Sequence, residues 1–125
     1  MYIGILKAAI KIAEKSSHHK CKIGAVIFKG SRIFAVGNNN IRSCSLVSKK
    51  YKTYENSLHA EQAAILNTSR KSLKGSDILV IRLSADKEFL RMARPCQMCM
   101  NFIQYVGIKN IWYSNLIGEI IKEKA

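Results

Sequence analysis

Two short apolar segments flank the dipeptide Gly30-Ser31, and this arrangement limits the folds available to the start of the chain. Residues 23–28 are rich in β-forming side chains, and residues 32–36 alternate between polar and apolar ones. The dipeptide between them is a hairpin signal, so we predict an antiparallel pair of strands. Upstream, a helical apolar pattern predicts an amphipathic helix over residues 2–16 that covers the sheet. The apolar stripe consists of Ile3, Leu6, Ala9, Ile10 and Ala13.

The rest of the chain alternates between helical and strand patterns. Residues 37–57 are rich in Asn, Ser and Lys and are predicted to form a long loop. A helix follows from Leu58, with Asn56 or Ser57 as its N-cap and Gly75 at its end. The later elements are a strand over residues 78–84, a helix from Pro95 to Val106 that Gly107 terminates, and a strand over residues 110–114. This order predicts a three-layer α/β/α fold with a mixed sheet of four to five strands, in a single domain over residues 1–125.

The C-terminal segment leaves two predictions open. Residues 118–122 form either a last strand or a short helix. A parallel crossover needs a dozen or more residues plus its strand, whereas eleven residues follow Ser114. If residues 118–122 form a strand, it must therefore pair with the preceding strand as an antiparallel hairpin.

Basic residues greatly outnumber acidic ones. The chain holds 21 Lys and Arg against 8 Asp and Glu, a formal net charge of +13, and no acidic residue lies between Glu14 and Glu55. Such a field attracts nucleic acids, anionic membranes or phosphorylated small molecules, and it also keeps a protein in solution. The charge alone does not choose among these uses.

No segment of the sequence indicates export or insertion into a membrane. Lys7 and Lys11 interrupt the apolar residues at the N-terminus, and no small-residue cleavage site follows them. No apolar run approaches the roughly 20 residues that cross a bilayer. We therefore expect a soluble, cytoplasmic protein without a membrane partner. In that compartment a Cys-x-x-Cys pair indicates metal or redox chemistry rather than a disulfide.

Two short motifs fall at predicted helix N-termini, His59-Ala60-Glu61 and Pro95-Cys96-x-x-Cys99. A catalytic zinc ion takes three protein ligands and leaves its fourth position open, and His59, Cys96 and Cys99 supply that number. Zinc lowers the pKa of a bound water toward about 7, and a nearby carboxylate such as Glu61 can take up and redeliver the proton. Hydrolytic deamination of an aminopyrimidine requires these acts, and H-x-E with P-C-x-x-C is a signature of zinc-dependent nucleobase deaminases.

Each motif alone has simpler interpretations. Cys-x-x-Cys also occurs in redox sites and in structural zinc sites, and His59 could be an ordinary capping residue. A structural zinc would need a fourth side-chain ligand. The candidates, which show no recognisable spacing, are His18, His19, Cys21 and Cys44. A thioredoxin-like site would leave His59 and Glu61 without a purpose, so a catalytic zinc accounts for more of the pattern.

The sequence resembles the cytidine and deoxycytidylate deaminase superfamily over most of its length. The resemblance lies in the stretches CKIGAVIFKG, IFAVGNNN, SLHAEQAAIL and ARPCQMCMNFIQYVGIKNIWYS. It implies a cytidine deaminase-like fold, Zn²⁺ as cofactor and a homo-oligomer. For the site, it implies zinc ligands at His59, Cys96 and Cys99, a proton shuttle at Glu61, and substrate contacts from Asn39 and the backbone N–H of Ala60.

Two features favour different branches of that superfamily. His59 stands where many free-cytidine deaminases carry Cys, whereas deoxycytidylate, cytosine, guanine and tRNA adenosine deaminases use His. A C-terminal hairpin, in contrast, would be typical of the cytidine deaminase branch.

Three functions follow as hypotheses. The first is deamination of a cytosine-containing nucleoside or nucleotide, with deoxycytidylate favoured by basic candidates for binding a 5′-phosphate: Arg42, Lys49, Lys50, Lys52 and Arg94. The second places the same chemistry on cytosine or adenine in single-stranded DNA or RNA, with Tyr51 and Tyr54 available for base stacking. The third is a zinc-bearing nucleic-acid-binding module with little activity. Trp112, on a predicted strand, is expected in the core rather than in a base-stacking role.

Overall fold

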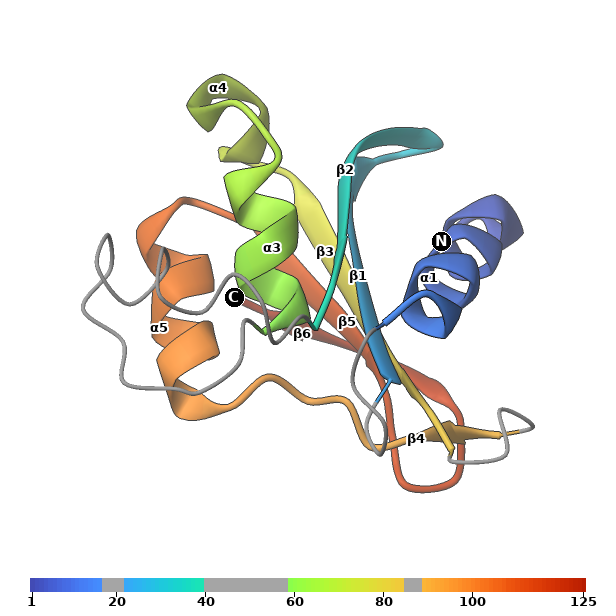
Figure 1. Cartoon of the computed structure of the whole chain (residues 1–125). Coiled ribbons are helices and arrows are strands. Elements are labelled where there is room, and N and C mark those ends of the chain that lie inside the picture. The colour runs from blue at the N-terminus through green and yellow to red at the C-terminus, as the bar shows by residue number, and fades with distance from the viewer. Residues whose placement is uncertain (17–21, 40–58, 85–88) are drawn as a thin grey trace.

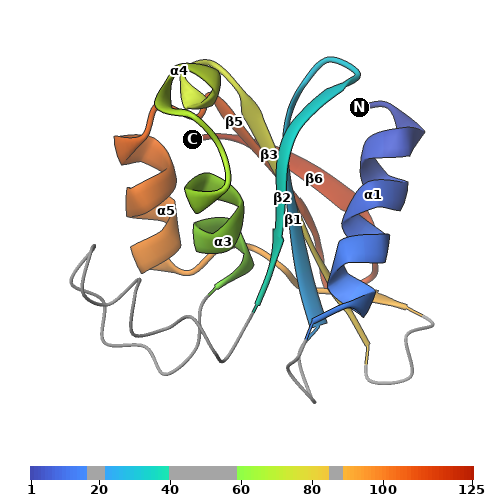
Figure 2. The same ribbon diagram turned by 45° about the horizontal axis from the view of Figure 1, so that its top comes forward.

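A computed structural model describes residues 1–16, 22–39, 59–84 and 89–125 of the chain. Its strands form one mixed sheet, which is the middle of three layers. Helix α1 (Ile3–Glu14) covers one face, and α3 (Ala60–Leu66) and α5 (Gln97–Tyr105) cover the other (Figures 1 and 2). The predicted three-layer α/β/α arrangement is confirmed. Within these segments, no helix combines the length and the apolar character needed to cross a bilayer.

Six strands make up the sheet in the described part of the chain, one more than the upper prediction. They are β1 (Lys22–Lys29), β2 (Arg32–Asn38), β3 (Asp77–Leu83), β4 (Leu90–Arg91), β5 (Asn110–Ser114) and β6 (Ile120–Lys124). Their order is β2-β1-β3-β5-β6, with β4 paired to β3 off this path. Among the neighbouring pairs of these described strands, only β3 and β5 are parallel. The sequence does not predict β4 because two residues are too few to establish a period of two.

Helix α1 contacts the sheet through Ile5, Ala9 and Ala13, which are buried against β1 and β3. These residues are four apart, so they lie on one face of the helix. The predicted apolar stripe is wrong in part, because Ile3 at the start of the helix is 70% exposed and Leu6 is only half-buried beside the true contact line.

Two glycines allow helices to approach the sheet closely. A Cβ atom on Gly24 of β1 would collide with the backbone of Ala9 in α1. A Cβ atom on Gly37 of β2 would likewise collide with the backbone of Ala60 and Ala64 in α3. The absence of a side chain at Gly37 therefore sets the position of α3.

The predicted helix from Leu58 to Gly75 is two separate helices. Helix α3 ends at Leu66, and α4 (Arg70–Leu73) begins after residues 67–69. Those residues are Asn, Thr and Ser, whose side chains compete with the helix for backbone hydrogen bonds. The Nδ2 atom of Asn67 donates to the carbonyl oxygen of Val36 at 3.0 Å, which ties the end of α3 to β2.

The C-terminal segment is a strand, which decides between the two predictions. β6 pairs antiparallel with β5, and Gly118 in the connecting turn has a φ of 84°. The Oδ1 atom of Asn115 accepts hydrogen bonds from the backbone N–H groups of Ile117 (3.1 Å) and Glu119 (2.9 Å). Trp112 is half-buried on β5 and packs against the core, so its predicted place is confirmed in part.

Candidate metal centre and adjacent pocket

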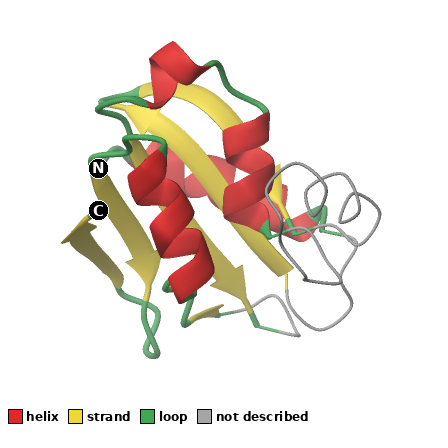
Figure 3. Ribbon diagram, turned by 90° about the vertical axis from the view of Figure 1, so that its left-hand side faces the viewer, coloured by secondary structure: helices red, strands yellow, loops and turns green. Residues whose placement is uncertain are grey.

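Helices α3 and α5 lie side by side on one face of the sheet and begin at the same end of it (Figure 3). His59 immediately precedes α3, and Cys96 immediately precedes α5. This arrangement brings together residues that are 37 positions apart in the sequence. The two motifs found in the sequence therefore meet at one place in the fold.

Each of these residues is the N-cap of its helix. The backbone N–H of His59 donates to the Oε1 atom of buried Gln62 at 3.0 Å, and the carbonyl oxygen of Cys96 accepts from Met100 at 2.8 Å. The prediction that His59 and Pro95 lie in the first helical turn is therefore wrong by one or two positions. Both N-cap residues have an extended backbone, and sequence periodicity does not separate such a residue from the first helical turn. The predicted N-caps Asn56 and Ser57 lie outside the described residues.

The donor atoms of three side chains form one compact cluster. The Nδ1 atom of His59 lies 3.1 Å from the Sγ atom of Cys99 and 3.8 Å from the Sγ atom of Cys96. All three donor atoms lie within 4.8 Å of one another. Tetrahedral zinc with ordinary Zn–S and Zn–N bonds requires N···S separations of about 3.6 Å, between the two observed values. The cluster therefore fits a zinc ion in both donor type and spacing.

The electrostatics of Cys99 also favour a bound cation. Burial raises the pKa of the Cys99 thiol far above its usual range, and the nearby Glu61 and Cys96 side chains raise the pKa further. A thiol in such a place keeps its proton unless a positive charge stabilises the thiolate. A divalent cation bound between the three donors would supply that charge.

A structural zinc would require a fourth ligand. Among the residues that the structure describes, no other His, Cys, Asp or Glu donor atom joins the cluster of His59, Cys96 and Cys99. The candidates named from the sequence, His18, His19, Cys21 and Cys44, lie outside the described residues.

Glu61 lies within α3, two residues after His59, and is only 5% exposed. Burial raises the pKa of its carboxyl group above the usual value, although its backbone hydrogen bond, His59 and Cys99 act in the opposite direction. A carboxyl group with a raised pKa holds and releases a proton more readily near neutral pH. A carboxyl group with these properties beside the cluster is chemically able to exchange a proton with a neighbouring group.

A cavity of about 290 Å³ opens next to these groups. Both Glu61 and His59 line it, together with residues from β1, β3 and the segment before α5. The full lining is Ile23, Asn39, His59, Glu61, Val80, Arg82, Met92, Ala93, Arg94, Pro95 and Cys96. The volume is close to the lower end of the range for small-molecule sites.

The structure brings the predicted substrate contact Asn39 to the cavity wall. Asn39 is buried, and its Oδ1 atom accepts hydrogen bonds from Ser16 Oγ and from the backbone N–H of Ile23 at 3.0 Å. Its side chain is thus held in place by the segment after α1 and by β1. Ala60, the other predicted contact, is fully buried in the first turn of α3 and follows His59 of the donor cluster.

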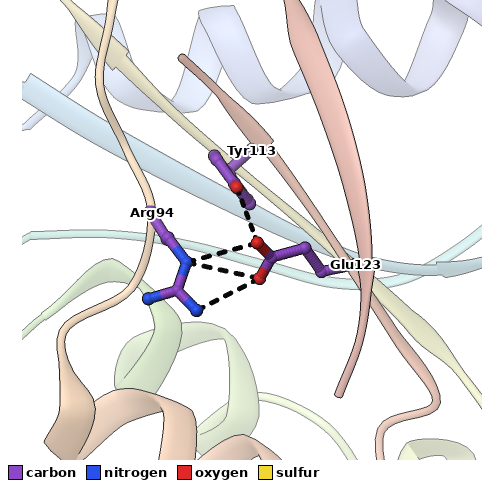
Figure 4. Close-up of polar contacts among 3 residues, drawn as sticks. All are labelled: Arg94, Tyr113 and Glu123. Carbon is purple, nitrogen blue, oxygen red and sulfur yellow. Dashed lines mark hydrogen bonds and ion pairs between the residues drawn. The ribbon is translucent and has the colours of Figure 1, made fainter. Parts of the chain in front are cut away.

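One of the predicted phosphate-binding residues lines the cavity, and it comes with two partners. Arg94 pairs with Glu123 of β6 at 3.2 Å, and the Tyr113 hydroxyl of β5 donates to the same carboxylate at 2.9 Å (Figure 4). Neither partner was predicted from the sequence, because both lie far along the chain. The other predicted basic residues lie outside the described residues: Arg42, Lys49, Lys50 and Lys52.

Arg82 is a further cavity residue that was not predicted from the sequence. It is the only charged residue in the apolar run of residues 78–84, and that interruption was the available signal. An ionic side chain in an otherwise buried strand needs a structural or functional reason.

Comparison with known proteins identifies a family model and relatives that match this chain. Residues 3–115 match the family model described as the cytidine and deoxycytidylate deaminase zinc-binding region. The chain is 27% identical to the deoxycytidylate deaminase of Mycobacterium phage D29 in an alignment of 129 positions that covers 90% of each chain.

Solved structures show the same relationship. The apo dCMP deaminase of cyanophage S-TIM5 is 26% identical, with a TM-score of 0.57 over 93% of this chain and 86% of its own. The cytidine deaminase of Burkholderia pseudomallei shares the fold at 16% identity, with a TM-score of 0.69 over 99% of this chain and 92% of its own.

Proposed function

Because this chain belongs to the cytidine and deoxycytidylate deaminase family, we propose that it catalyses zinc-dependent hydrolytic deamination of a cytosine-containing nucleoside or nucleotide. The product is the corresponding uracil compound, and ammonia is released. The observation that carries this proposal is the convergence of His59, Cys96 and Cys99 beside the buried carboxyl group of Glu61. His59, Glu61 and Cys96 line the same cavity.

Three side chains would hold the metal. They are His59 through Nδ1, and Cys96 and Cys99 through Sγ, because these are the atoms that face one another. Zinc, when bound, supplies a Lewis acid that lowers the pKa of water to about 7. Cys99 is buried, and electrostatic interactions are stronger at a buried group than at an exposed one.

Glu61 would carry the protons of the reaction. Its carboxylate takes one proton from water as the water oxygen forms a bond to C4 of the cytosine ring, and it delivers that proton to N3. It then takes the remaining hydroxyl proton and passes it to the amino nitrogen. The C4–N bond breaks with its electron pair on nitrogen, ammonia leaves, and C4 keeps the oxygen as a carbonyl group. The raised pKa of Glu61 suits both halves of this cycle.

Deoxycytidylate is the substrate that we favour. Two relatives with 26% and 27% identity are named as deaminases of this nucleotide, and a further S-TIM5 structure, 25% identical, holds dCMP and dUMP. His59 also favours deoxycytidylate, because deoxycytidylate deaminases use His at this position and many free-cytidine deaminases carry Cys. The antiparallel β5–β6 hairpin favours instead the free nucleosides cytidine and deoxycytidine, because that hairpin is typical of the cytidine deaminase branch.

A substrate series tests the proposal. Zinc-loaded protein is incubated separately with dCMP, CMP, deoxycytidine, cytidine, adenosine, and single-stranded DNA and RNA, and ammonia and products are quantified. We expect conversion of at least one free cytosine nucleoside or nucleotide, with dCMP fastest, and conversion slower by at least about 100-fold in Glu61→Gln. Turnover of only the polynucleotides, or binding of nucleic acid without any turnover, would overturn it.

A further inference from the structure

Arg82 is an unusual member of the cavity wall. It lies near the end of β3, a strand that is paired on both sides, and its side chain lines the cavity beside His59 and Glu61. The residue is half-buried, and its Nε atom is fully shielded from solvent. Its backbone N–H is directed at Ser114 Oγ at 3.4 Å, so the strand is held in place at this point.

The guanidinium group of Arg82 lacks a partner in the described part of the chain. Its buried Nε atom has no hydrogen-bond acceptor, and no ion pair to it is found there. A buried charged donor without an acceptor is destabilising, and natural proteins rarely keep such groups without a reason. Arg91 of β4 pairs directly with Arg82 in the sheet register, so a second positive charge adds to the cost.

Arg94, the second arginine in the cavity wall, has a partner for its charge. The Nε and Nη2 atoms of Arg94 both face the carboxylate of Glu123, which also accepts from Tyr113 (Figure 4). Its charge is therefore already balanced by a protein carboxylate. Of the two cavity arginines, Arg82 is the one whose charge lacks a counterion among the described residues.

A nucleotide would supply that counterion. A guanidinium group matches the oxygen atoms of a phosphate with two parallel hydrogen bonds, and charged hydrogen bonds of this kind are the strongest available to a side chain. A free nucleoside carries no charge and would leave Arg82 unpaired. The cavity thus has a recognition element that distinguishes these two classes of substrate.

We propose that Arg82 is a specificity-determining residue that binds the phosphate group of a nucleoside monophosphate substrate. The proposal rests on the deaminase function argued above and names the substrate class of that site. Arg94, whose charge is paired with Glu123, contributes less to this discrimination.

Paired substrates that differ only in the phosphate test the assignment. We expect Arg82→Gln to lower kcat/KM for dCMP by about 10- to 100-fold and to change kcat/KM for deoxycytidine by less than about 3-fold. Arg82→Lys, which keeps the charge but loses the planar fork, should fall between wild type and Arg82→Gln. Arg91→Gln is the matched control, because it removes the same charge from the exposed residue that pairs with Arg82 but lies outside the cavity lining.

Several results would overturn the assignment. One is an equal loss of kcat/KM for dCMP and deoxycytidine in Arg82→Gln, and another is a wild-type protein that does not prefer dCMP. The assignment also fails if Arg91→Gln has the same effect as Arg82→Gln, or if Arg94→Gln causes a larger selective loss of kcat/KM for dCMP than Arg82→Gln does. Calorimetric titration with dUMP and deoxyuridine gives a readout that does not depend on turnover. If wild type binds dUMP more tightly than deoxyuridine and Arg82→Gln removes the difference, the assignment holds even where deamination fails. Turnover of dCMP and deoxycytidine at equal rates would leave the deaminase function intact and refute the role of Arg82.

Discussion

The Nδ1 atom of His59 lies 3.1 Å from the Sγ atom of Cys99, although the two residues are 40 positions apart in the sequence. The contact exists because α3 and α5 start side by side at the same end of the sheet (Figure 3). Any change that shifts one helix relative to the other alters this separation. The stability of the fold and the spacing of the proposed zinc donors are therefore linked.

Replacement of Cys99 by alanine should remove zinc and weaken the fold. We expect zinc content to fall from about one ion per chain to near zero and the melting temperature to fall by at least about 5 °C, because metal binding contributes to folding free energy. Elemental analysis and calorimetry measure the two quantities. Met98→Leu, between the two cysteines, should behave as wild type. A Cys99→Ala protein that keeps its full zinc content would contradict the ligand set.

Replacement of Glu61 by glutamine separates proton transfer from metal binding. We expect kcat to fall by about 10²- to 10⁴-fold, since a general acid and base is lost, while zinc content stays the same. Steady-state kinetics and elemental analysis provide the measurements, and Glu119→Gln on the exposed hairpin serves as the control. Loss of zinc in Glu61→Gln would mean that Glu61 is a ligand rather than a proton carrier.

Gly37 should be essential for the position of α3. Gly37→Ala places a methyl group against the backbone of Ala60 and Ala64, so we expect a loss of about 1–3 kcal/mol in the free energy of unfolding and weaker zinc binding. Denaturant unfolding and zinc titration measure both. Gly4→Ala is the matched control, because a methyl group at that position would meet no atom within 4 Å. Equal effects of the two substitutions would refute the role of Gly37.

The titration of Glu123 reports on its contact with Tyr113. The Tyr113 hydrogen bond and then the Arg94 hydrogen bond hold the pKa of the Glu123 carboxyl below its usual 4.5. The ionised form thus favours the folded state, and this contribution is present above pH 4.5 and is lost as the pH falls through the lowered pKa. In Tyr113→Phe the pKa of Glu123 should rise, as followed by NMR of the side-chain carboxyl carbon. An unchanged titration would show that the hydrogen bond has no influence.

The sequence alone predicts those elements in which apolar side chains recur with a clear period. The hairpin around Gly30 and the strand over residues 110–114 were predictable because local patterns and turn residues agree with the final packing. The break between α3 and α4 was not, because the helix pattern continues through Asn67 while its side chain bonds to β2. β4 was too short to leave a pattern.

The candidate site was predictable only where its chemistry lies within short motifs. The spacing of His59 with Glu61, and of Cys96 with Cys99, indicated a metal site, since few other functions require both motifs. The pairing of Arg94 with Glu123 depends on how β6 folds back along β5, and no local pattern encodes it. Arg82 interrupts an apolar strand in the sequence, but the lack of a partner for its Nε atom is a property of the described structure alone.

The dependence of dCMP deamination on zinc content tests the central proposal most directly. Metal-free protein is titrated with zinc, and bound zinc and ammonia release from dCMP are measured in the same samples by elemental analysis and kinetics. The proposed function predicts that activity rises in proportion to bound zinc and reaches its maximum at one ion per chain. Folded protein that carries one zinc per chain and releases no ammonia from dCMP, CMP, deoxycytidine or cytidine would contradict it.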